Sequence, residues 1–282
     1  MTRRENFLNA LRKRPYERMP FTIVIDPFNY PMPVPEALCT PEITSFSDPA
    51  GYAELQKYLG CDVLFRISPQ CYNINYTGGA FNQWASAEDG SQIITFGVND
   101  RKLSYEINYT PGADTQYQKS HAVKCEEDYK LLTEYFSKQT YSINPAGIEE
   151  DKRYLKEIGN DGICYNCIPN TPYMDLARTW VGIEQFIYDL ADYTETVEET
   201  MNVMAEKAYE QCEIICANTP CEVLVFWDDC NSLYMTPRQY KKYCMPVHKR
   251  FAEIAHKYNK IIVCHTCGKI NAFLDLLPQT GL

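Results

Sequence analysis

Residues 222–268 read EVLVFWDDCNSLYMTPRQYKKYCMPVHKRFAEIAHKYNKIIVCHTCG, and this stretch decides the fold. Its two apolar runs, 222–227 and 260–264, have the length and continuous hydrophobicity of strands buried on both faces. Between them, Thr236 supplies a helix cap, with Pro in the first turn and Gln239 at the third position. A stripe at three- and four-residue spacing follows: Tyr240, Tyr243, Cys244, Val247, Phe251, Ile254 and Tyr258. A strand–helix–strand unit of this kind predicts a parallel α/β sheet.

The same alternation extends through the chain. Three further strands are predicted over 21–25, 62–67 and 162–168. Helices are predicted from the capping box of Thr2 and Glu5, from Asp48-Pro49, over 126–138, and from a second capping box of Thr196 and Glu199. We therefore expect one domain over residues 1–282.

Residues 72–120 differ from the rest, because they are rich in Tyr, Asn, Thr and Gly. Residues 103–108 alternate between apolar and polar side chains, 92–96 are β-prone, and Asn99-Asp100 between them is a turn signal. This pattern predicts an antiparallel hairpin inserted after the second strand.

Composition limits the possible functions. The 282 residues contain 27 Lys and Arg against 37 Asp and Glu, a net charge of −10, which disfavours nucleic acid and anionic membranes as partners. No segment has the length and apolarity of a membrane span, and the charged N-terminus does not resemble a secretory signal, so we expect a cytoplasmic protein. The 13 cysteines are then expected to be reduced, most of them packed as small apolar side chains.

Polar residues follow the predicted strands. His265 and Cys267 are two apart on an extended segment, so both point the same way; both are first-choice zinc ligands, and Gly268 lets the chain turn away. By itself the pair is a weak signal, because a histidine and a cysteine at this spacing are more often simply packed. Asp228 and Asp229 end the preceding strand, where sites form in parallel α/β folds, and each could instead be a cap or turn residue.

Further polar residues lie near other strand ends. Asp26 ends the first predicted strand, and Asn166 and Asn170 flank the end of the third, so these three are candidate substrate-binding residues. Cys164 and Cys167 have metal-like spacing, but within a strand they face opposite sides, which disfavours shared coordination.

Taken in order, these motifs resemble the uroporphyrinogen decarboxylase superfamily, especially its corrinoid-dependent methyltransferase branch. The similar segments span nearly the whole chain: Thr2-Arg3-Arg4-Glu5, Arg18-Met19-Pro20, Gly60-Cys61-Asp62, Thr110-Pro111-Gly112, Glu127-Asp128-Tyr129, Gly182-Ile183-Glu184-Gln185-Phe186, Asp228-Asp229, Thr236-Pro237, and His265 to Gly268. The resemblance implies a TIM-like (β/α)8 barrel. It also implies that His265 and Cys267 are zinc ligands, with a further cysteine later in the chain. Five predicted strands are fewer than eight, so we expect a barrel truncated after about five β/α units.

The resemblance implies a zinc-dependent methyltransferase that acts between a small methylated donor or acceptor thiol and a corrinoid. Asp228 or Asp229 would orient the substrate or support His265. The sequence has no D-x-H-x-x-G corrinoid motif, so the corrinoid is expected on a separate partner protein. A decarboxylase is the alternative, but residues 21–56 contain no Lys or Arg where that branch has carboxylate-binding arginines. An inactive barrel fragment is a second alternative, and a homo-oligomer stays open.

Overall fold

In the computed structural model we describe residues 1–23, 48–67, 71–110 and 115–282. The predicted parallel α/β sheet is confirmed. Four strands pair in the order β1-β8-β9-β10, all parallel, with Val63 opposite Gly162 and His265 opposite Trp227. Their bounds are β1 Val63–Ile67, β8 Gly162–Cys167, β9 Val223–Trp227 and β10 Ile261–His265.

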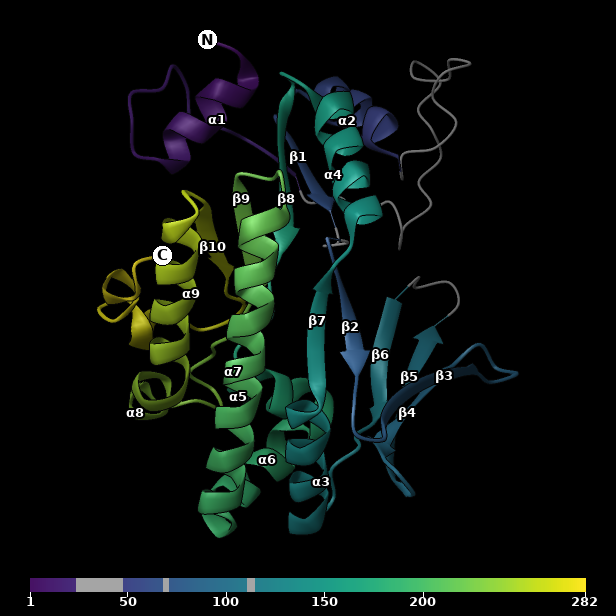
Figure 1. Ribbon diagram of the computed structural model, residues 1–282. Coiled ribbons are helices and arrows are strands. Elements are labelled where there is room, and N and C mark those ends of the chain that lie inside the picture. Colours follow the sequence, from purple (N-terminus) through teal and green to yellow (C-terminus); the bar gives the residue numbers. More distant parts are fainter. Residues whose placement is uncertain (24–47, 68–70, 111–114) are drawn as a thin grey trace.

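Four helices cover one face of this sheet (Figure 1). They are α2 Pro49–Tyr58, α4 Pro145–Ile158, α7 Thr194–Asn218 and α9 Met245–Lys257. Their apolar stripes pack on alternate strand residues such as Phe65, Leu224 and Phe226, which are almost fully buried. The opposite, inner face is contacted by Phe7 and Leu8 of α1 (Arg3–Leu11), whereas Val225, Trp227 and Val263 stay only partly covered.

Within the described residues the sheet is open and does not close into a barrel. Of the first predicted strand, Phe21 to Ile23 form no strand, and the remainder lies outside the described residues together with Asp26. The other four predicted strands are present within a residue or two of their expected bounds.

The region after the first sheet strand contains more than a hairpin. Strands β4 (Gln92–Val98) and β5 (Arg101–Thr110) run antiparallel on either side of Asn99-Asp100. β3 (Ala80–Ser86) and β6 (Thr115–Ser120) extend them into a four-stranded sheet. β2 (Tyr72–Tyr76) pairs separately with β7 (Gln139–Ile143), which follows α3 (Glu126–Ser137).

The capping box of Thr2 and Glu5 at α1 is confirmed, and so is the Thr236 cap at α8, where Gln239 completes a capping box. The capping box predicted at Thr196 and Glu199 is wrong, because α7 begins at Thr194, ahead of Thr196, whose hydroxyl donates instead to Glu126. The remaining helical segments are α5 Pro172–Asp175, π-helix η2 Leu176–Trp180, α6 Ile183–Asp192, α8 Pro237–Gln239, π-helix η3 Tyr240–Cys244, η4 Asn271–Phe273 and η5 Leu277–Thr280.

Candidate metal centre

Three potential metal ligands converge where β9 and β10 end. The Nε2 atom of His265 lies 2.6 Å from the Sγ atom of Cys267, and the Asp229 carboxylate completes a group whose ligand atoms are all within 4.8 Å of one another. His265 and Cys267 are exposed and Asp229 is half-buried. The carboxyl ends of parallel strands are the usual location of sites in α/β folds.

Trp227 and Arg66 flank this group. The ring of His265 lies 4.6 Å, centroid to centroid, from the ring of Trp227, its cross-strand neighbour. The Trp227 indole donates a hydrogen bond to the Cys167 Sγ atom at 3.5 Å, and the Arg66 guanidinium lies 5.2 Å from the indole centroid. The tilted ring contact with Trp227 therefore restricts the orientation of the His265 imidazole.

Arg178 holds the third ligand. It lies in the π-helix η2, a form of helix that recurs at functional sites. Its Nη1 atom is 2.7 Å from Oδ2 of Asp229 and donates a longer bond to the Trp227 carbonyl. The Cys267 thiol has a raised pKa, because neighbouring atoms desolvate it and because the Asp229 carboxylate is close.

The turn after Cys267 depends on a glycine. Gly268 has a φ of +95°, and a Cβ atom there would lie 2.2 Å from Nδ2 of Asn231. Asn231 in turn accepts hydrogen bonds from the backbone of Leu233 and Lys269, which links the β9 loop to the β10 loop. The expectation that Gly268 turns the chain at this point is confirmed.

Asp228 lies apart from this group, on the helix-covered side of the sheet. Its carboxylate is fully buried, accepts a bond from the Thr171 backbone N–H at 3.0 Å, and lies 2.7 Å from Nε2 of His248. Only its backbone reaches the candidate centre, because its N–H donates to the His265 carbonyl. The two adjacent carboxylates therefore have different environments.

The two candidate asparagines, Asn166 and Asn170, lie in different surroundings. Asn170 joins the site region, because its Oδ1 accepts from the Trp227 backbone N–H and its Nδ2 donates to Asp175. Asn166 does not, since its side chain is buried and donates to Asp151 and Thr219 on the outer side of the sheet.

The donor set fits a zinc ion. Imidazole nitrogen, thiolate sulfur and carboxylate oxygen are the three ligand types that zinc takes in proteins, and three protein ligands leave a position open for a substrate. Arg178 on Asp229 also supplies the kind of outer hydrogen bond that orients a metal ligand.

The sequence did not identify Arg178 or Trp227, or Asp229 as a ligand. Strand alternation is a signal for two of them, because Trp227 and Asp229 have the same parity whereas Asp228 has the other. No sequence signal identifies Arg178, since it is 51 residues from Asp229 and reaches it only through the packing of η2.

Comparisons with known proteins agree with this architecture. Residues 173–282 match the model of the family "Uroporphyrinogen decarboxylase (URO-D)". A solved methyltransferase from Methanosarcina mazei has a similar fold, with a TM-score of 0.54 at 13% sequence identity, covering 100% of this chain and 74% of that one. No curated protein matches the sequence.

A search of the described residues for a long, apolar helix that could cross a membrane found none.

The family match over residues 173–282, together with a fold similar to that of the solved neighbour, confirms the resemblance to the uroporphyrinogen decarboxylase superfamily.

Proposed function

We propose that this chain is a zinc-dependent methyltransferase. It moves a methyl group between a small methylated compound or thiol and a corrinoid carried by a separate protein. The convergence of His265, Cys267 and Asp229 at the carboxyl ends of the strands carries the proposal. The superfamily match and the neighbour's description as a methyltransferase support it.

His265, Cys267 and Asp229 would hold the metal, and a bound zinc supplies a Lewis acid for a methyl donor or an acceptor thiol. Trp227 fixes the imidazole plane, and Arg178 fixes the carboxylate. Because His265 and Cys267 are exposed, a substrate and the surface of a partner protein can approach from the same side.

Metal content tests the ligand assignment. We expect the wild-type chain to bind zinc at this centre. Removal of one ligand should weaken zinc binding by at least about tenfold in each of three variants, His265→Ala, Cys267→Ser and Asp229→Asn. Cys125→Ser is the matched control, since Cys125 is exposed and caps α3 away from the site. Zinc affinity measured by competition with a chromogenic chelator gives the readout, and unchanged affinity in the three ligand variants would contradict the assignment.

Methyl transfer tests the activity. The zinc-loaded protein is mixed with reduced cobalamin and a panel of methyl ethers, methylamines, methanol and methyl thioethers, or with methylcobalamin and small thiols. The visible absorbance of the corrinoid reports gain or loss of its methyl group. We expect turnover with at least one member of these panels and its loss in Cys267→Ser. No turnover with any of them in the zinc-loaded wild-type protein would count against a methyltransferase.

Decarboxylation is the second candidate, favoured by the name of the matched family and by Arg66 and Arg178 beside Trp227. Arginines recognise carboxylates, which this chemistry requires. Arg178 is already paired with Asp229, however, which leaves fewer free guanidinium groups than a polycarboxylate needs. Carbon dioxide release from a porphyrinogen by zinc-free protein, unchanged in His265→Ala, would select this alternative.

A further inference from the structure

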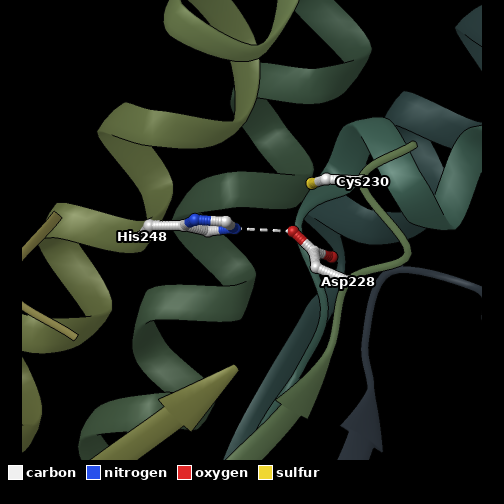
Figure 2. Close-up of side chains that lie close together, drawn as sticks. All are labelled: Asp228, Cys230 and His248. Atoms are coloured by element: carbon white, nitrogen blue, oxygen red, sulfur yellow. Dashed lines mark hydrogen bonds and ion pairs between the residues drawn. The ribbon is translucent and has the colours of Figure 1, made fainter. Parts of the chain in front are cut away.

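A second group of potential metal ligands lies on the other side of the sheet end. Asp228, Cys230 and His248 are each at most 1% exposed, and their ligand atoms lie within 4.8 Å of one another. Figure 2 shows the His248 ring and the Asp228 carboxylate pointing at one another, with the Cys230 sulfur beside them. This group does not take part in the function proposed above.

A fourth donor lies next to this group. The buried Cys244 thiol accepts a hydrogen bond from the Thr171 hydroxyl at 3.8 Å, and the backbone N–H of the same threonine donates to Asp228 at 3.0 Å. Asp228 and Cys230 are two residues apart, and Cys244 and His248 are four apart, one helical turn, at the junction of η3 and α9. Both are spacings that place two side chains on one side of a segment, as paired metal ligands require.

The outward-facing atoms of the cluster are already occupied. The Nδ1 atom of His248 hydrogen-bonds to the Tyr240 hydroxyl at 3.1 Å, and Oδ1 of Asp228 accepts from the Thr171 N–H at 3.0 Å. Nε2 of His248 and Oδ2 of Asp228 face one another across 2.7 Å, and the Cys230 thiol lies within 4.8 Å of both side chains. Ligands of protein metal sites are typically oriented by such outer hydrogen bonds.

We propose that Asp228, Cys230, Cys244 and His248 bind a structural zinc ion, distinct from the ion at His265 and Cys267. Four nitrogen, oxygen and sulfur donors in a closed, buried position are typical of structural zinc, whereas a catalytic centre keeps a position open. Binding releases the two thiol protons to solvent, and the His248 ring donates its remaining proton to Tyr240.

This ion would connect the end of β9 to η3 and α9. Asp228 precedes Asp229 directly, and its N–H donates to the carbonyl of His265. The buried ion would therefore fix the spacing between the strand ends that carry the exposed ligands. In a metal-free core, by contrast, His248 donates directly to Asp228 across the observed 2.7 Å.

The double variant His265→Ala/Cys267→Ser isolates the buried site, because it empties the exposed one. After zinc loading and desalting, elemental analysis should find about one zinc ion per chain in this variant and about two in the wild type. Cobalt(II) loaded into the double variant should give the intense absorption of cobalt–thiolate bonds. A double variant with no retained zinc and no such absorption would overturn the proposal.

Adding Cys230→Ser or Cys244→Ser to the double variant should remove the remaining zinc. The matched controls are Cys212→Ser and Cys216→Ser. These two cysteines are also buried, they are separated by one turn of α7, and their Sγ atoms lie 3.9 Å from one another. They should leave the zinc content unchanged. Equal loss of zinc in all four variants would refute the assignment. The cobalt spectrum is recorded with Cys230 and Cys244 intact, so it tests the site even if a serine variant misfolds. Zinc retained by the double variant reports the buried site alone, whereas the difference in zinc content between the wild type and the double variant reports the exposed centre, so the two proposals fail independently.

Discussion

Asp228 and Asp229 are adjacent but lie on opposite faces of the sheet end. Asp229 is half-buried beside His265, Cys267 and Arg178, whereas Asp228 is completely buried beside His248. Strand alternation is the reason, because successive side chains point to opposite faces. The prediction that both carboxylates serve one site is therefore wrong for Asp228, and only Asp229 lies at the candidate metal centre.

Asp175 supplies a pH-dependent contribution to stability. Burial raises the pKa of its carboxyl from 3.8 to about 6, partly offset by the hydrogen bond from Asn170. Between those two values the folded state keeps a proton that the unfolded state has lost, so this contribution to stability falls as pH rises through that range.

We expect Asp175→Asn to gain stability relative to the wild type by on the order of 2 kcal/mol between pH 4 and pH 7, because the amide keeps its acceptor for Asn170 and never ionises. Urea unfolding of both proteins at the two pH values measures this difference, and contributions from other groups cancel. A difference between the proteins that does not change with pH would contradict the prediction.

At the scale of elements, local signals predict the helix starts well. The capping boxes at α1 and α8 and the Asp48-Pro49 start of α2 depend only on residues within one turn. The wrong start at Thr196 has a tertiary cause, because its hydroxyl pairs with Glu126 of α3 and the helix extends back to Thr194. A cap motif predicts a helix start only where its side chain does not hydrogen-bond to a neighbouring element instead.

Thr236 tests the value of one of these caps. Its hydroxyl accepts from the Gln239 N–H at 3.2 Å, and the Gln239 side chain accepts from the Thr236 N–H at 2.8 Å. Thr236→Ala should lower the free energy of unfolding by about 1 kcal/mol, because the cap is lost. Thr236→Ser keeps the hydroxyl and should lose less than half of that amount. Equal losses in urea unfolding of the two variants would show that the cap contributes nothing.

At the scale of the whole molecule, Trp180 connects the antiparallel sheet to the candidate centre. Its ring contacts Phe96 and Tyr105 of that sheet and Phe136 of α3, with centroid separations of 5.0 to 5.6 Å. Trp180 is also the last residue of η2, which carries Arg178 to Asp229. The added sheet thus packs against the segment that positions Asp229, a candidate metal ligand.

We expect Trp180→Ala to lower the free energy of unfolding by about 3 kcal/mol, because a large, partly buried ring leaves a cavity. It should also weaken zinc binding at His265 and Cys267, since η2 loses its support. Trp84→Ala is the control, because Trp84 is 64% exposed and should change stability by less than about 0.5 kcal/mol. Reduced stability of Trp180→Ala with unchanged zinc affinity would refute the coupling.

The sequence by itself determined the parallel α/β core, its strand positions and the His265–Cys267 pair. These depend on local patterns: continuous apolar runs, three- and four-residue stripes, and two-residue spacing on an extended segment. The antiparallel turn at Asn99-Asp100 is local in the same sense.

Only the tertiary structure decided which side chains meet. Arg178 reaches Asp229, His248 reaches Asp228, and Trp180 joins three elements, all across long separations in the chain. It also placed Asn166 in an outer hydrogen-bond network and left Asn170 by the strand ends. The physical reason is that periodicity fixes the face on which a side chain lies, whereas the packing of helices on the sheet fixes which other side chain it meets.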